Sequence, residues 1–439
     1  MDPIDFLEKK IATLSLEDYE IYAVESQLFS VQSKEGEIEF SEKALEQGVA
    51  VRLFKGGKSG FCCSSDWTPP YLERIVDLSY NSLSLVEDGV RFELPSRRGQ
   101  KEKKVLKTPE IPMQAKIETA LALEREAKNF DRRITKVRDV RYSEEMRTVI
   151  LKNSRGLEAE HTAAYHDLSL MVVAEEKGDQ QMAWEEEFSP RFSELDPKKT
   201  AVRAAEKAVS QLGARPIATQ TSAAVLDPVV AASFLGVLSS SFLGDQVLKN
   251  RSSLKGKLGE EIYSPQVNLL DDGRFPGGYG TLPFDGEGTE TRTSEVVSQG
   301  VLKEFLYDLR AAAEAGREAT GNAVRANFKE PPRVGPTNFF IQPGKGSLEE
   351  LFAEMGTGFW IRDVIGVHTA DPVTGDFSLG ANGVWMEGGK RGEAVRGVTI
   401  SGNLHEILKR VLRAGEEIRF YHSYGSPPLF ISALDIGGL

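Results

Sequence analysis

The amino-acid sequence predicts an α+β protein of two domains, in which antiparallel and mixed sheets pack against helices. Capped helices alternate with hairpin-forming strands in the first half, without the repeated strand–helix–strand order of a parallel α/β sheet. The same mixture returns after a charged helical stretch that ends near residue 213. Because 439 residues exceed one average domain, we expect an N-terminal α+β domain over residues 1–210 and a C-terminal α+β domain over residues 211–439.

The first half begins with a helix and continues into strands. Asp2 occupies the N-cap position, and apolar residues follow it at helical spacing. Two short runs of alternating apolar and polar residues, 19–24 and 29–40, predict strands, and 48–65 predicts a hairpin with a double-glycine turn. Further helices are predicted after Thr68, over 114–129 and over 196–213, and a meander is predicted from strands 146–152, 157–175 and 180–188.

The second half is organised around one apolar helix. The run SAAVL at 222–226 predicts a strand, and the stretch 227–244 predicts a helix that contains no ionisable side chain after its first residue. Its apolar residues recur at helical spacing, so we expect a core helix in which Gly236 and the serines allow a neighbouring segment to approach. Later strands alternate with helices predicted over 306–316 and 347–355.

Composition and charge exclude several classes of protein. Hydrophobic residues make up 40% of the chain and charged residues 27%, as in soluble globular proteins. Neither a long apolar run nor a signal-peptide pattern is present, so we expect a cytoplasmic protein without membrane contact. The net charge of −12 opposes binding to nucleic acid. The basic stretch PSRRGQKEKKVLK has no interleaved aromatic residue, and we interpret its cations as part of a solvated connecting loop: Arg97, Arg98, Lys101, Lys103, Lys104 and Lys107.

Cysteines and histidines give weak support for a metal site. Cys62 and Cys63 are the only two cysteines and are adjacent in an expected strand, so they exclude a disulfide scaffold and a CxxC zinc pair, and we interpret them as buried thiols. His161 and His166, in HTAAYH, share an expected strand with odd spacing. Their side chains therefore point to opposite faces with Cα atoms about 16 Å apart, which favours residues at the surface or an interface over ligands of one zinc ion. His405 lies in an amphipathic stretch, which indicates a partly exposed structural histidine.

One motif in the second half carries a family resemblance. The segment DPVTGDFSLGANG at 371–383, followed by GVTISGNL at 397–404, resembles the signature of the TldD/PmbA family, in particular its PmbA (TldE) branch. Other segments agree with this resemblance, namely TLPFDGEGTETRT at 281–293, the TNFFIQPGKGSLEELFAEMGTGFWI block, and the ending GSPPLFISALDIGGL. The resemblance extends over essentially the whole chain, more loosely in the first half.

The resemblance implies a two-domain α+β protein whose relatives pair as a TldD chain and a TldE chain and act as a zinc metalloprotease on unfolded peptides. It implies that TldD binds the zinc, through a helix with His-Glu-x-x-x-His and a cysteine near the carboxyl terminus. Here the equivalent helix has Leu235 and Ser240 at the histidine positions and Gly236 at the glutamate position, and the cysteine loop is missing after Gly425. Leucine is not a zinc ligand and serine is a poor one.

The resemblance therefore assigns no catalytic residue, metal ligand or cofactor to this chain, and zinc is expected in the partner subunit. We expect a TldE-like, non-catalytic subunit that pairs with a TldD-like chain and acts on unfolded peptides. A homodimer of the lone chain is left open. Two alternatives stay open. One is an independent metal-free hydrolase using His368 and Asp376, and the other is a nucleic-acid-associated regulator, after the family's older description as a modulator of DNA gyrase.

The signature segment itself favours tight turns. Pro372 and Gly375 suit a β-turn, and the acids lack the spacing of an EF-hand calcium loop. The resemblance adds a second interpretation, a loop that lines a cavity or a partner interface. Its candidate residues are His368, Asp371, Asp376 and Phe377.

Overall fold

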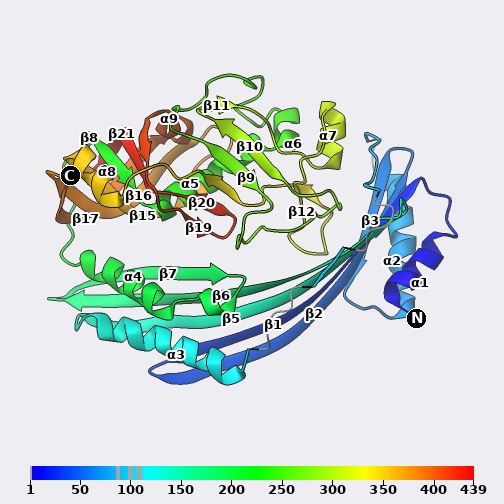
Figure 1. Ribbon diagram of the computed structural model, residues 1–439, viewed down its shortest axis with the longest axis horizontal. Helices are drawn as coiled ribbons and strands as arrows, with labels where there is room; N and C mark the ends of the chain where they lie inside the picture. Colours follow the sequence, from blue (N-terminus) through cyan, green and yellow to red (C-terminus); the bar gives the residue numbers. More distant parts are fainter. Residues whose placement is uncertain (1, 86–88, 97–101, 106–110) are drawn as a thin grey trace.

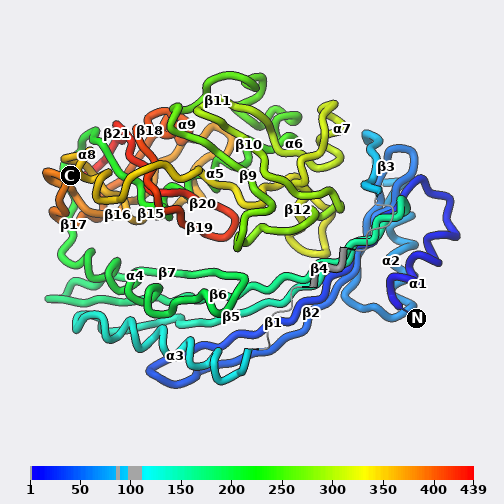
Figure 2. Tube along the Cα trace, viewed as in Figure 1, coloured from blue at the N-terminus to red at the C-terminus, as the bar shows by residue number. Residues whose placement is uncertain are grey.

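The computed structural model describes residues 2–85, 89–96, 102–105 and 111–439, with the backbone alone for 102–105. It confirms the α+β class, because several sheets and separate helices make up the chain. Figure 1 shows two bodies, a long curved N-terminal sheet and a C-terminal body of smaller sheets that lies above it. The two ends of the chain lie at opposite ends of the molecule (Figure 2).

The N-terminal sheet has seven strands in the order β3-β2-β1-β5-β6-β4, with β7 paired to β6 as well. All its pairings are antiparallel except that of β4 with β6. Its four central strands are 17 to 20 residues long, which corresponds to roughly 55 to 65 Å. The strands are β1 (Asp18–Lys34), β2 (Glu37–Lys55), β3 (Lys58–Ser64), β4 (Glu102–Val105), β5 (Ile134–Asn153), β6 (Glu158–Glu176) and β7 (Asp179–Ser189).

Two sequence predictions about this sheet are corrected. The runs 19–24 and 29–40 are not two short strands, because β1 continues through both and the hairpin turn falls inside the second run. Glu35 and Gly36 make that turn with φ of 55° and 83°. The basic stretch is not entirely a solvated loop, since residues 102–105 form β4 against β6, while residues 97–101 and 106–110 lie outside the described part of the chain.

Helices cover one face of the sheet. Odd-numbered residues of β1, such as Ile21 and Phe29, are buried beneath them. The first helix starts as predicted, with the Asp2 carboxylate accepting a hydrogen bond from the amide of Ile4 at 2.8 Å. On the opposite face, Tyr22 packs against Phe284 of the C-terminal body. The covering helices are α1 (Pro3–Ile11), α2 (Pro69–Ser82), α3 (Met113–Phe130) and α4 (Pro197–Ser210).

The C-terminal body contains two six-stranded sheets and a two-stranded pair. The first sheet, in the order β17-β16-β15-β8-β21-β18, consists of β8 (Gln220–Leu226), β15 (Gly358–Ile365), β16 (Asp376–Glu387), β17 (Lys390–Asn403), β18 (Val411–Ala414) and β21 (Leu429–Gly437). The second, in the order β11-β10-β9-β14-β20-β19, consists of β9 (Leu269–Asp272), β10 (Thr293–Ser298), β11 (Val301–Leu302), β14 (Phe339–Ile341), β19 (Arg419–Tyr421) and β20 (Tyr424–Ser426). The pair is β12 (Ala323–Val324) and β13 (Arg333–Val334).

The helices of the C-terminal body match their predicted ranges to different degrees, and the one predicted over 306–316 begins later, at Leu309. The helix predicted over 227–244 ends at Leu238 and continues as a 3-10 turn, where the Ser239 hydroxyl donates to the carbonyl of Gly236 at 2.7 Å. A capping box between Ser347 and Glu350 confirms the start of the helix predicted over 347–355. The helices are α5 (Pro228–Leu238), α6 (Gly244–Leu248), α7 (Leu309–Ala315), α8 (Leu348–Met355) and α9 (Leu404–Lys409). None of the helices in the described ranges combines the length and apolarity needed to cross a bilayer.

Both cysteines lie on β3, at the edge of the N-terminal sheet. Cys62 and Cys63 are free thiols and half-buried, so the prediction of buried thiols is only partly right. Helix α2 packs against this edge strand and covers the two thiols only in part. Burial still raises the pKa of the Cys63 thiol, which keeps it protonated at neutral pH.

Candidate functional site

Helix α5 runs through the core of the C-terminal body and begins at a buried carboxylate. The Asp227 carboxylate accepts a hydrogen bond from the amide of Val229 at 3.3 Å. Burial raises the pKa of Asp227, although nearby cations, Lys207 first among them, act in the opposite direction. The apolar residues that follow pack into the largest buried cluster of this body, as expected for a core helix.

The three positions that the resemblance matched to zinc-motif residues contact different neighbours, and they lie in α5 and in the 3-10 turn that follows it. Leu235 is 1% exposed and faces apolar side chains only. At Gly236, an added Cβ would lie 3.5 Å from the ring of Tyr424, which is the close neighbouring segment expected from the sequence. The Ser240 hydroxyl donates to the carbonyl oxygen of Pro372 at 3.0 Å. Position 240 therefore touches the signature loop, whereas position 235 is sealed in the core.

The signature loop is a closed turn that is bonded to itself and to the start of α9. The Asp371 carboxylate accepts hydrogen bonds from the amides of Val373 at 2.7 Å and Thr374 at 3.1 Å. The Asn403 amide donates to the Thr374 carbonyl and to the Asp376 carboxylate, both at 2.8 Å. These contacts confirm the tight turns predicted from the sequence and leave the loop rigid.

The structure separates the four candidate residues of this loop. His368, Asp371 and Asp376 are exposed. Phe377 is 6% exposed and packs against Phe234 of α5, with ring centroids 5.4 Å apart. Asp376 is held by an asparagine rather than by His368, so the described contacts do not join these two into an acid–base pair.

His405 is buried rather than partly exposed, because it lies between a tyrosine and a serine. Its Nδ1 is 2.8 Å from the hydroxyl of Tyr263, and its Nε2 is 3.0 Å from the hydroxyl of Ser253. The buried Tyr263 donates its proton to Nδ1, so the proton of the neutral imidazole is on Nε2 and points to Ser253. This tautomer does not activate Ser253 as a nucleophile, since a general base must accept the serine proton. Sequence analysis did not find this cluster, whose members are about 150 positions apart.

The stability difference between wild type and His405→Gln is expected to depend on pH. Burial, and then the charges of Lys257 and Lys409, lower the pKa of His405 to about 4. Between about pH 6.5 and 4 the unfolded chain takes up the proton and the folded chain does not, so this histidine's contribution falls as pH falls, by up to roughly 3 kcal/mol. Chemical unfolding at several pH values measures this change in the free energy of unfolding. The variant His422→Gln, at an exposed position, should have the same pH dependence as wild type. The same pH dependence for His405→Gln and wild type would contradict the assignment.

His161 and His166 point to opposite faces of β6, as predicted, but both are buried. His166 lies on the helix-covered face, where Tyr142 donates to Glu144 at 2.7 Å and so accepts from Nδ1 of His166 at 3.0 Å. His161 lines a cavity between the sheet and the C-terminal body. Their exposed fractions are 7% and 4%, because each face of β6 is covered by another part of the chain. Of the two predicted positions, surface or interface, the surface is wrong for both, and His161 lies where the sheet meets the C-terminal body.

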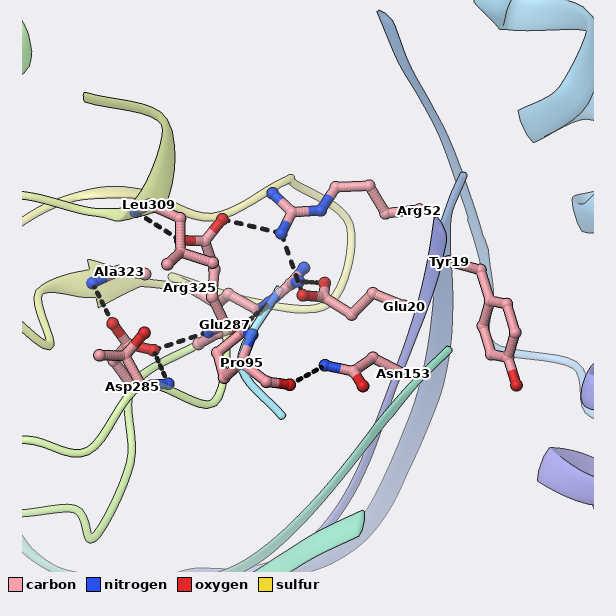
Figure 3. Close-up of polar contacts among 12 residues, drawn as sticks. Tyr19, Glu20, Arg52, Pro95, Asn153, Asp285, Glu287, Leu309, Ala323 and Arg325 are labelled. Atoms are coloured by element: carbon pink, nitrogen blue, oxygen red, sulfur yellow. Dashed lines mark hydrogen bonds and ion pairs between the residues drawn. The ribbon is translucent and has the colours of Figure 1, made fainter. Parts of the chain in front are cut away.

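A buried ionic network joins the N-terminal sheet to the C-terminal body (Figure 3). Arg52 contacts Glu20 at 3.0 Å and Glu287 at 2.7 Å, and Arg325 pairs with the other carboxylate oxygen of Glu20. Each of these side chains is at most 7% exposed. Figure 3 shows Glu20 and Arg52 extending from the sheet toward Glu287 and Arg325, so the four charges lie where the two bodies meet.

A second ionic cluster lies near the start of α5. Glu185 of β7 is fully buried and contacts Lys207 of α4 at 2.6 Å and Arg419 of β19. Burial alone would raise the pKa of Glu185, but these cations hold it below its usual range. Glu206 of α4 adds an ion pair with Arg362 at 3.1 Å. Helix α4 is thus fixed to the C-terminal body beside the N-cap of α5.

Within the described part of the chain, the side chains do not form a site for a metal ion. The described ranges contain no group of three or more His, Cys, Asp or Glu side chains placed to hold one. At the positions that the resemblance matched to zinc ligands, Leu235 has no donor atom and the hydroxyl of Ser240 is used by Pro372. We therefore derive no chemical step through zinc bound to this chain.

Comparison with protein families gives three consecutive matches to one family. The matches are to domain 1 of the PmbA/TldA metallopeptidases over residues 19–82, to the central domain over 107–212, and to the C-terminal domain over 219–438. The first two fall on the N-terminal sheet and its helices, and the third covers the C-terminal body. Together they include nearly every element described above.

Relatives and solved structures agree along the whole length. An uncharacterised protein of Methanocaldococcus jannaschii is 30% identical over 418 residues, covering 92% of this chain and 94% of the relative. Metalloprotease PmbA of Escherichia coli O157:H7 is 25% identical, covering 93% and 90%. A Thermotoga maritima structure described as a modulator of a DNA gyrase superposes with a TM-score of 0.90 at 26% identity, covering 99% of this chain and 100% of the other. The structure of TldE from Thermococcus kodakarensis superposes with a TM-score of 0.88 at 22% identity, covering 99% of each chain. The chain therefore belongs to the PmbA/TldD family of metallopeptidases, as a member of PmbA/TldE type.

Proposed function

We propose that this chain is the non-catalytic, TldE-type subunit of a heterodimeric zinc peptidase that degrades or trims unfolded peptides in the cytoplasm. The observation that supports this most directly is the chemistry of α5. The family fold is kept across the chain, yet position 235 is sealed in apolar core and position 240 carries a hydroxyl bonded to Pro372. Zinc and the catalytic base are supplied by a TldD-like partner in this proposal.

The signature loop supports a role in contact rather than in chemistry. Its exposed segment carries apolar residues, with Val373 at 40% exposure and Ile365, at the base of the loop, at 60%. Its polar groups are bonded within the chain through Asp371 and Asn403. A rigid loop loses little conformational entropy on binding. We place it at the interface with the partner or along the shared peptide channel.

The independent hydrolase has less support. His368 and Asp376 are exposed, and no described contact joins them. In the Ser253–His405 pair, the imidazole proton is on the nitrogen that faces the serine. A nucleic-acid regulator is opposed by the net charge of −12, although the Thermotoga maritima relative bears the gyrase-modulator description.

The test is to express the chain with a zinc-bearing relative from the same genome. We expect a 1:1 complex in size-exclusion chromatography with light scattering, and hydrolysis of unfolded casein peptides that is greater for the complex than for either chain. His368→Ala should leave this activity unchanged. Absence of both a complex and any change in the partner's activity would refute the proposal, as would hydrolysis by the lone chain that His368→Ala abolishes.

A further inference from the structure

A cavity of about 170 Å³ lies between the N-terminal sheet and the C-terminal body. Tyr22 and Tyr165 form its wall on the sheet side, and Tyr279 and Phe284 form its wall on the other side. The rings of Tyr165 and Tyr279 approach to 5.3 Å between centroids, so the aromatic walls come from both bodies. We name this space the aromatic cavity.

The two arginines that line the aromatic cavity are already paired. Arg147 makes two hydrogen bonds to Glu145, at 2.8 and 3.0 Å. Arg325 is paired with Glu20, donates to the Gly286 carbonyl at 2.9 Å, and stacks over the ring of Tyr22 at 4.5 Å. A charged ligand group would therefore find no unpaired counter-charge at these arginines, and its desolvation would be uncompensated.

Asp285 is the remaining carboxyl group in the cavity wall, and it too is occupied. It accepts hydrogen bonds from the amides of Glu287, Thr289 and Ala323 at 2.9 to 3.0 Å. Burial, and then the charge of Glu287, raise its pKa to about 8, against the effect of those amides. The charged groups of the cavity wall are therefore paired or neutral, and its aromatic rings supply apolar surface.

The cavity is preformed because tight backbone contacts build part of its wall. An added Cβ at Gly280 would lie 2.3 Å from the Thr337 carbonyl oxygen, and one at Gly321 would lie 2.5 Å from that of Glu290. A second cavity, of about 160 Å³, shares Tyr22, Arg147 and Arg325 with the first and is lined by polar residues such as Gln47. Polar surroundings suited to a peptide backbone therefore lie next to the first cavity, across these shared side chains.

We propose that the aromatic cavity binds one uncharged aromatic side chain of an extended peptide. An apolar protein cavity of about 150 Å³ is large enough to hold benzene, so this space has the size for one ring. The inference rests on the proposed function only in taking the ligand to be a peptide. It assigns this subunit a substrate contact of its own, separate from the chemistry of the partner.

The test uses the purified lone chain and a capped pentapeptide, alanine on both sides of a central 4-fluorophenylalanine, observed by fluorine NMR. We expect saturable binding of this peptide. Competing pentapeptides carry phenylalanine, glycine or lysine at the central position, and the phenylalanine peptide should displace the probe at a concentration at least tenfold lower than the other two. Because no partner is present, failure here leaves the proposal of a heterodimer intact.

Matched variants locate the site. Ala163 lines the cavity and is paired with Arg147 of β5. Ala44 is paired with Leu28 of β1, which places it on the same face of the sheet but outside the cavity. Ala163→Leu should weaken binding at least tenfold, and Ala44→Leu should leave it unchanged. If Ala163→Leu does not fold, Tyr279→Ala decides, since it removes a half-exposed wall and should also weaken binding at least fivefold. The proposal is overturned if the probe does not bind, or if the glycine or lysine peptide binds as tightly as the phenylalanine peptide. It is also overturned if Ala163→Leu, or Tyr279→Ala where the first variant does not fold, binds with wild-type affinity.

Discussion

Replacing Arg325 with methionine is expected to destabilise the folded chain by about 3 to 5 kcal/mol, because it leaves a buried carboxylate without one of its two cations. Arg325 is 2% exposed and Glu20 is 1% exposed, so water cannot replace the lost partner. Methionine keeps most of the volume, which separates the loss of charge from a loss of packing. Guanidinium unfolding followed by tryptophan fluorescence measures the change.

Two further variants make the comparison specific. Arg310→Met removes an exposed cation, 65% accessible, that pairs with Glu314, and it should cost less than about 1 kcal/mol. The double variant Arg325→Met/Glu20→Gln should be more stable than Arg325→Met alone, because it also neutralises the stranded carboxylate. A cost for Arg325→Met similar to that of Arg310→Met would show that the network does not hold the two bodies together.

Introducing the zinc motif into α5 is expected to fail. The triple variant Leu235→His/Gly236→Glu/Ser240→His should bind no stoichiometric zinc and should lose about 3 kcal/mol or more of stability. Leu235 is 1% exposed among apolar side chains, so an imidazole there is buried without a hydrogen-bond partner. The resemblance also implies a third ligand, a cysteine, and the variant does not supply it. Zinc content after equilibrium dialysis and the midpoint of thermal unfolding measure both effects.

The single variant Ser240→His is the control for this experiment. It replaces one hydroxyl that bonds the Pro372 carbonyl, and its cost should stay near 1 kcal/mol. Most of the instability of the triple variant should therefore appear in Leu235→His alone. Tight binding of one zinc ion per triple-variant chain would contradict this prediction, because it would require the three side chains to meet around one metal ion.

Local features of the fold were predictable from the sequence. The caps at Asp2 and Asp227 and the capping box at Ser347 depend on residues at most four positions apart, and each confirmed a helix start. Alternation within β6 predicted the divergence of its two histidines, because side-chain direction in a strand depends only on spacing. Helix ends were less certain, as the serines after Leu238 show.

Contacts between distant segments were not predictable from one sequence. The Glu20–Arg325 pair spans 305 positions, and the Arg52–Glu287 pair spans 235. Sequence alternation also did not show that His161 would be covered by the C-terminal body, which is why its burial was missed. At the candidate site, the resemblance identified α5 and the signature loop, but their contact through Ser240 and Pro372 required the structure.

The most direct test of the central claim is the metal content of the chain alone and in complex with its zinc-bearing relative. After dialysis against trace zinc, the lone chain should hold less than about 0.1 zinc per molecule, and the complex should hold about one zinc per heterodimer, consistent with a donor set this chain lacks. Stoichiometric zinc in the lone chain, removed by a chelator together with peptidase activity, would contradict the account.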